Sequence, residues 1–267
     1  MKSTRGMVLA FVIIVSVGSA ASGQKAPPSA PTAADWEAIA KLPDFTGVWE
    51  VSLGGGNRAA APAARNLGAG APAGPSLTPA YAAKRDAIRV AGREDNETAN
   101  CLPPGMPGIM NQPYPIEFLL TPGMVTIVIE AYTQVRHIYT GGRPLPEDPD
   151  LTFQGTSIGH WEGDTLVAET VGFSPLTYLA SGVPHSDKMR IVERFKLVDP
   201  DTMTIETTIT DPEALTKPYT SSRTLKRHRS WTIAEYICEE NNRNFVDEKG
   251  KAGVTLGNPG GLPQKKD

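Results

Sequence analysis

The chain has few of the groups that several common functions require. It holds 26 Lys and Arg against 29 Asp and Glu, so it lacks the basic excess of a nucleic-acid-binding surface. Its four histidines show none of the close spacings of a metal site. A glycine-rich phosphate loop and a Gly-x-Ser-x-Gly nucleophile motif are also missing. We therefore expect no nucleic-acid partner, no metal and no cofactor.

Long hydrophobic runs are scarce, because only one occurs, over residues 7–17. It follows two basic residues and precedes a row of small ones, the order of a secretory signal peptide. The run is shorter than the roughly 20 residues of a membrane-spanning helix. We expect a signal peptide over residues 1–23 and a periplasmic or secreted mature chain without stable membrane insertion. An uncleaved membrane anchor is the alternative.

Cysteine is nearly absent, since only Cys101 and Cys238 occur. In an oxidising compartment two cysteines most simply form one disulfide. Two separate thiols are one alternative. A catalytic thiol is another, but it needs a pKa-lowering neighbour, and no adjacent residue clearly supplies one. The prediction is a disulfide between an early loop and the last strand.

What the chain does contain is a series of strand-length runs at short spacing, separated by turn residues. Short connections force neighbouring strands to be antiparallel. We therefore predict an all-β fold, a single antiparallel lipocalin-like barrel of about ten strands over residues 45–240. The expected strands are 45–51, 116–121, 124–132, 134–140, 156–161, 165–171, 189–198, 202–210, 222–228 and 231–238.

The rest of the chain is expected to be helical or irregular. Residues 54–76 are dominated by Gly, Ala and Pro and predict a mobile loop. Thr78-Pro79 predicts the start of a helix over 78–91. The remaining segments are a flexible lead-in over 24–44 with a short helix at 35–41, and a C-terminal tail over 241–267.

Strand alternation identifies candidate site residues, because successive side chains point to opposite faces. Glu193 shares its face with Ile191 and Phe195 and is therefore expected inside the barrel. A buried carboxylate must be paired or protonated, and burial raises its pKa, which suits a general acid or base. A structural ion pair of Arg136 with Glu193 or Glu130 is the alternative.

His185 is a second candidate, in the loop that leads to the strand of Glu193. Loops at the rim of a barrel often carry function. Asp187 is a candidate for orienting the ring. A Ser-His-Asp triad within three consecutive residues is geometrically implausible and is rejected. An exposed or capping histidine is the alternative.

Several short motifs lie along the chain's strand-rich part, and the most specific of them is Trp-Glu-Gly-Asp-Thr-Leu at 161–166. Through these motifs the chain resembles a family of exported bacterial proteins to which no activity is assigned. The chain differs from the family pattern at Gly141, where an Asp is expected, and at Tyr178, where a Trp is expected. Phe45-x-Gly47-x-Trp49 resembles the first strand of lipocalin-like barrels. The other matching segments are 44–49, 136–140, 142–144, 155, 157–160, 184–187, 193–195 and 211–212.

Together these patterns favour a barrel that binds a small, largely apolar organic molecule. Arg136 is expected to hold an anionic or carbonyl group of the ligand, and Tyr139 and His185 to donate hydrogen bonds. The first alternative is a cofactor-independent lyase, isomerase or hydratase, in which Glu193 or His185 moves a proton and Arg136 stabilises an oxyanion. A structural envelope protein is the second alternative. The oligomeric state stays open. The candidate ligand-binding residues are Glu130, Arg136, Tyr139, His185 and Glu193.

Overall fold

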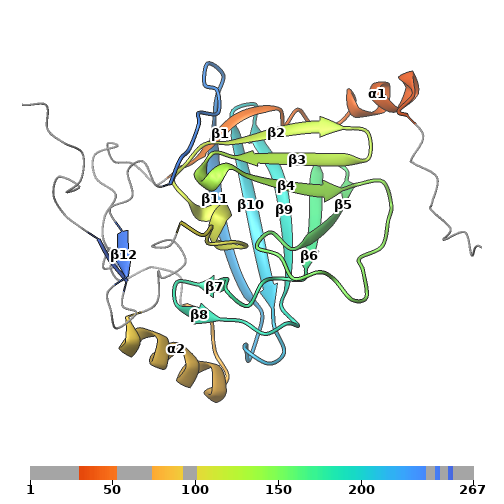
Figure 1. The fold of residues 1–267 in the computed structure, drawn as a ribbon. Coiled ribbons are helices and arrows are strands. Elements are labelled where there is room, and N and C mark those ends of the chain that lie inside the picture. The colour runs from red at the N-terminus through yellow and green to blue at the C-terminus, as the bar shows by residue number, and fades with distance from the viewer. Residues whose placement is uncertain (1–29, 53–73, 93–100, 239–243, 247–251, 255–267) are drawn as a thin grey trace, which may run out of the picture. The chain divides into compact units, whose positions relative to one another are not determined.

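The structure is a computed structural model that describes residues 30–52, 74–92, 101–238, 244–246 and 252–254. The predicted signal peptide and most of the 54–76 loop lie outside these residues. Within them, nine strands form one closed barrel in the order β1-β11-β10-β9-β6-β5-β4-β3-β2 (Figure 1). The barrel strands are β1 (Gly47–Val51), β2 (Ile116–Thr121), β3 (Met124–Ile129), β4 (Gln134–Tyr139), β5 (Thr156–Glu162), β6 (Thr165–Val171), β9 (Arg190–Asp199), β10 (Thr202–Thr210) and β11 (Tyr219–His228).

The helices and small sheets lie outside the barrel's hydrogen-bonded ring. The helices are α1 (Ala33–Ile39), α2 (Pro79–Ala91) and the 3-10 turns η1 (Gly108–Asn111) and η2 (Ala131–Thr133). The small sheets pair β7 (Tyr178–Ala180) with β8 (Val183–Pro184) and β12 (Asn244–Val246) with β13 (Ala252–Val254). Among the described residues, no helix has both the length and the apolar character that crossing a membrane requires.

Local sequence explains where the helices begin and end. α1 begins two residues before the expected position because Thr32 and Asp35 form a capping box. α2 starts at Pro79, whose fixed φ suits a first turn, and ends at Gly92, which adopts the left-handed conformation at φ 62°. The second helix therefore matches its sequence prediction closely.

The expectation of a purely antiparallel barrel is wrong at one step, since β4 and β5 pair in parallel. Their connection runs over residues 140–155. A parallel pair needs a crossover of about a dozen residues or more, and this connection is long enough to provide one. All other neighbours in the ring are antiparallel.

The expected last strand, residues 231–238, is also absent, and the barrel has nine strands rather than about ten. The physical reason is closure of the ring. One edge of β11 pairs with β10 and the other with β1, whose second edge pairs with β2. No edge is left for a further strand.

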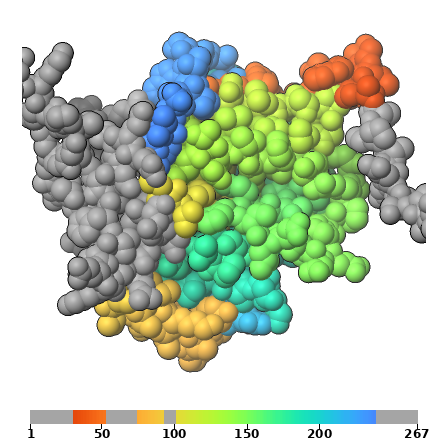
Figure 2. All heavy atoms as spheres, viewed as in Figure 1, coloured from red at the N-terminus to blue at the C-terminus, as the bar shows by residue number. Residues whose placement is uncertain are grey.

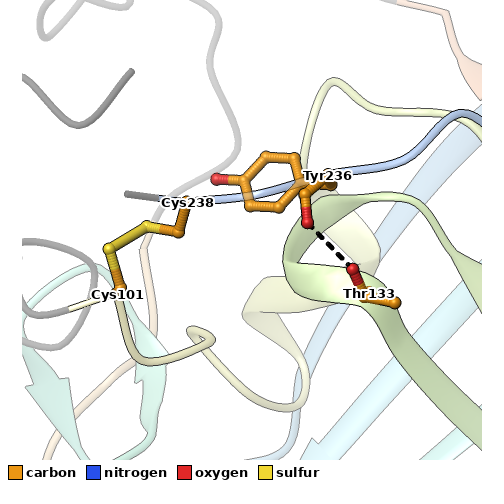
Figure 3. Close-up of a disulfide and its surroundings, with 4 residues drawn as sticks. All are labelled: Cys101, Thr133, Tyr236 and Cys238. Carbon is orange, nitrogen blue, oxygen red and sulfur yellow. Dashed lines mark hydrogen bonds between the residues drawn. A yellow bond between two sulfur atoms is a disulfide. The ribbon is translucent and has the colours of Figure 1, made fainter. Parts of the chain in front are cut away.

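Residues 231–238, here called the strap, instead attach to the end of the barrel near η2. The backbone N–H of Ala234 donates to the Glu130 carboxylate at 3.0 Å, and the Thr133 hydroxyl donates to the Tyr236 carbonyl at 3.0 Å. Cys238 is bonded to Cys101, which confirms the predicted disulfide (Figure 3). The strap is therefore tied to two other segments of the chain.

Aromatic side chains fill one part of the barrel interior. Phe118 packs edge-on against Phe45 and Phe195, with ring centroids 6.2 and 5.9 Å apart. Nearby, the Arg227 guanidinium lies 4.5 Å from the Trp49 ring, and its Nη1 lies 2.9 Å from Asp44 Oδ2. The Trp49 indole N–H donates to the Phe45 carbonyl at 2.9 Å. This part of the interior is occupied by the protein's own side chains.

The disulfide generates the first prediction. Replacing both Cys101 and Cys238 with Ser lowers the free energy of unfolding by about 2–5 kcal/mol, because the bond restricts the unfolded chain across a long loop. The bonded residues are separated by 137 positions in the sequence. Denaturant unfolding measures the change, and the wild-type protein in reductant serves as the control. Equal stability of the two proteins in the absence of reductant would contradict the prediction.

Candidate functional site

A buried ion pair lies at the centre of the candidate site. Arg136 on β4 and Glu193 on β9 both point into the barrel, and their side chains are 1% and 0% exposed. Nη2 of Arg136 lies 2.5 Å from Oε2 of Glu193. The prediction that Glu193 lies inside the barrel is therefore confirmed. Its partner is Arg136, as in the structural ion pair that the sequence analysis gave as the alternative to an acid–base role.

Hydroxyl groups on the two strands between them hold the arginine. Arg136 Nε donates to Ser157 on β5 at 3.3 Å, and Nη2 donates to Thr170 on β6 at 3.0 Å. Ser157 and Thr170 are paired in the β5–β6 register, and their hydroxyls lie 2.8 Å apart. The guanidinium is thus fixed from two sides.

A second arginine lies on the other side of Glu193. Arg223 on β11 has Nη2 3.9 Å from Oε1 of Glu193, and the same nitrogen donates to Thr207 at 3.0 Å. Its Nη1 donates to Oδ1 of Asn111 at 2.5 Å. Here the polar cluster means Arg136, Ser157, Thr170, Glu193, Thr207 and Arg223.

Several atoms of the polar cluster keep unused hydrogen-bonding capacity. Among the described residues, Arg136 Nη1 has no hydrogen-bond partner although it is buried. Neither Glu193 oxygen accepts a hydrogen bond of regular geometry from the residues that the structure describes, and the 2.5 Å contact with Arg136 is an ion pair. Buried polar groups in proteins are nearly always satisfied. These atoms therefore mark a place where a polar ligand atom would be stabilised.

The charges of the polar cluster do not balance. Two guanidinium groups face one carboxylate. Burial lowers the pKa of Arg223, Glu193 raises it, and the positive charge of Arg136 lowers it further, so the net direction is down. An arginine nevertheless stays charged in proteins. The interior therefore carries an excess of positive charge.

The other sequence-predicted residues lie elsewhere. Tyr139 is on β4 but on its outer face, where Arg143 lies over its ring at 3.3 Å. Glu130 accepts the hydrogen bond of the strap. His185 lies in the loop between β8 and β9, with Nε2 2.9 Å from the Thr177 hydroxyl and Nδ1 2.7 Å from the Ser186 carbonyl oxygen. Only Arg136 and Glu193 meet.

Asp211, not Asp187, is the carboxylate that organises the loop around His185. Its oxygens accept hydrogen bonds from the backbone N–H and hydroxyl of Ser186, both at 2.7 Å, and from the N–H groups of Glu213 and Ala214. Burial opposes ionisation of Asp211, but these hydrogen bonds outweigh it and lower its pKa. The group holds the loop before β9 against the loop after β10.

The charged member of the polar cluster that sequence reasoning missed is Arg223. The expected strand began at residue 222, and the faces of that strand were not assigned. The structure starts β11 at Tyr219. Extending the alternation back from Leu225, which is fully buried, would have placed Arg223 on the interior face.

An outer cleft of 460 Å³ offers a competing site. It lies between the β4–β5 connection, at Leu145 to Glu147, and the start of β9. Its two cations already have partners, since Lys188 pairs with Glu213 and Arg190 with Glu169. The part of the chain that the structure describes holds no cluster of His, Cys, Asp or Glu suited to a metal ion. The polar cluster remains the stronger candidate.

Comparison with models of known families and with curated proteins gives no match for this chain. The resemblance to an exported bacterial family and to lipocalin-like barrels therefore stays a prediction from the sequence.

Removing one partner of the buried ion pair should lower the free energy of unfolding. Arg136→Met leaves the Glu193 carboxylate without its closest partner and lowers the free energy of unfolding by about 3–5 kcal/mol. Adding Glu193→Leu removes the buried charge and recovers most of that loss. Denaturant unfolding of the single and double variants measures both effects. A double variant less stable than Arg136→Met alone would contradict this account.

The lowered pKa of Asp211 predicts a pH dependence of stability. A carboxyl group whose pKa is lower in the folded state stabilises the fold above its unfolded pKa, about 3.9, and loses that effect as the pH falls through its folded pKa. Wild type should therefore exceed Asp211→Asn in unfolding free energy near pH 7, with the gap narrowing below about pH 4. Asp187→Asn, at an exposed position of the same loop, is the control and should track wild type. A gap independent of pH would refute the role given to the charge of Asp211.

Proposed function

We propose that the barrel binds a small organic molecule through the polar cluster, with an anionic or carbonyl group of the ligand on Arg136. The single observation that carries the proposal is the buried Nη1 of Arg136, which has no hydrogen-bond partner among the described residues. A ligand oxygen at this nitrogen would satisfy it. The excess of two guanidinium groups over one carboxylate favours a ligand with negative charge.

Apolar side chains around the polar cluster support an apolar ligand body. On the interior face, Ile127 is the register partner of Arg136, and Ile191 of Thr170. Met106, Ile109 and Met110, from the segment that contains η1, are also fully buried. A polar head beside such surroundings is the usual composition of a small-molecule site, in which a few placed polar groups orient a mainly apolar ligand.

The disulfide supports the proposed location. Such bonds persist in oxidising compartments and are rare in the cytosol. Together with the expected signal peptide, it favours a periplasmic or secreted protein.

The rival acid–base enzyme has less support from the geometry. Glu193 lies against a guanidinium that does not release its proton, an arrangement suited to holding charge rather than moving a proton. The second proposed proton carrier, His185, has its described hydrogen-bond contacts with Ser186 beside it and with Ser174 and Thr177 of the segment between β6 and β7. A binding role therefore fits the polar cluster better.

Three probes test the proposal: decanoate, decan-1-ol and decyltrimethylammonium. Their alkyl chains are of nearly equal length, whereas their head groups are anionic, neutral and cationic. Calorimetric titration of the mature protein should show decanoate binding at least about tenfold more tightly than the other two, as expected for a charge-assisted contact. Binding of none of the three, together with identical native and denatured masses of protein purified from its own periplasm, would overturn the proposal.

The charge of Glu193 gives a directional test. Glu193→Gln keeps the shape and removes the negative charge, so decanoate affinity should rise by several-fold while decan-1-ol affinity stays constant. Thermal unfolding in the absence of ligand monitors the fold. For an enzyme that uses Glu193 as its acid or base, the same variant would instead abolish turnover. A fall in decanoate affinity in a folded variant would contradict the anion-binding role.

A further inference from the structure

Arg223 differs from the other charged members of the polar cluster because it reaches the surface of the protein. Its side chain is 10% exposed, whereas Arg136 and Glu193 are 1% and 0% exposed. The interior-facing residues of β11 show the same gradient, since Leu225 is fully buried and Ser221 is only half-buried. The polar cluster therefore opens towards solvent at Arg223.

At this opening Arg223 contacts a neutral side chain, that of Asn111. Asn111 ends η1, its side chain is exposed, and its Oδ1 accepts the hydrogen bond of Arg223 Nη1 at 2.5 Å. Figure 2 shows the yellow atoms of the segment around η1 reaching the surface. A side-chain amide supplies an oxygen to the guanidinium but no negative charge. The contact with Asn111 leaves the charge of Arg223 uncompensated.

The other contacts of Arg223 do not compensate that charge fully either. Thr207 is neutral, and Glu193 is 3.9 Å away and much closer to Arg136. A buried cation of this kind is stabilised by any anion that approaches it with good geometry. A carboxylate at the position of the Asn111 oxygen would supply both the hydrogen-bond acceptor and the missing charge.

We infer that Arg223 and Asn111 form the mouth of the site, where a ligand carboxylate displaces the Asn111 side chain from the arginine, an inference that rests on the proposed function. The ligand is thus a monocarboxylate with an apolar body, and its carboxylate places one oxygen on Arg223 and directs the other to Arg136, since the two arginines flank the same Glu193. Asn111 sets the specificity of the mouth by competing for Arg223 without adding charge. The neutral amide keeps Arg223 satisfied until an anion arrives.

Three single variants test the inference, with decanoate and decan-1-ol as probes. Asn111→Asp has the same shape and places a permanent carboxylate on Arg223. It should weaken decanoate binding by about tenfold or more and leave decan-1-ol binding unchanged. Asn111→Ala removes the competing oxygen and should leave decanoate binding equal or tighter.

Gln112→Glu is the matched control, because it adds the same charge one residue further along. The Gln112 side-chain amide donates to the Gly108 carbonyl at 3.4 Å instead of contacting Arg223. This variant should change decanoate binding by less than about twofold, since the half-buried Gln112 side chain makes no described contact with Arg223 and its added charge is partly screened by solvent. Thermal unfolding of all variants confirms that each is folded.

The outcomes separate this inference from the proposed function. If wild type binds none of the probes, the proposed function fails and the inference fails with it. If wild type binds decanoate but Asn111→Asp and Gln112→Glu weaken it equally, binding stands and the mouth at Asn111 is wrong. Weaker decanoate binding by Asn111→Ala would likewise overturn the inference, because the side chain would then belong to the site.

Discussion

The ion pair of Arg136 and Glu193 is the constraint around which the barrel interior is arranged. Both groups are removed from water, which is costly unless each is compensated by a partner and by hydrogen bonds. Ser157 and Thr170 supply hydroxyl groups to the arginine, and Arg223 lies beyond the carboxylate. Five strands, β4, β5, β6, β9 and β11, must keep their register for these contacts to form.

Closure of the ring decides much of the remaining architecture. Once β1 joins β2 to β11, no strand edge within the barrel is open, and the C-terminal strap attaches by side chains and a disulfide instead of a backbone ladder. The long connection between β4 and β5 permits the single parallel step. The elements that sequence reasoning misplaced are therefore those whose position depends on which edges other strands had already taken.

In the candidate site, too, some residues could be placed from local sequence and others only from the closed barrel. Alternation along β9 was enough to place Glu193 inside, because Ile191 and Phe195 flank it on one face. It was not enough for β4, where Arg136 and Tyr139 lie on opposite faces and only the closed barrel shows which face is interior. His185 and Glu130 are polar and near strand ends, but His185 contacts the carbonyl of the neighbouring Ser186, and Glu130 accepts a hydrogen bond from Ala234 of the strap. Position in a loop alone does not show whether a side chain reaches the barrel interior.

The sequence by itself determined the strand-rich fold, the approximate positions of the nine barrel strands, the helix of residues 79–91 and the cysteine pairing. These follow from local signals: the period of two, the turn residues between runs, a proline at the first turn of a helix and the presence of only two cysteines. Only the tertiary structure decided which residue pairs with Glu193, that Arg223 faces the barrel interior, and that the strap lies outside the sheet. Those depend on contacts between strands far apart in the chain, and closure of the barrel fixes which of them meet.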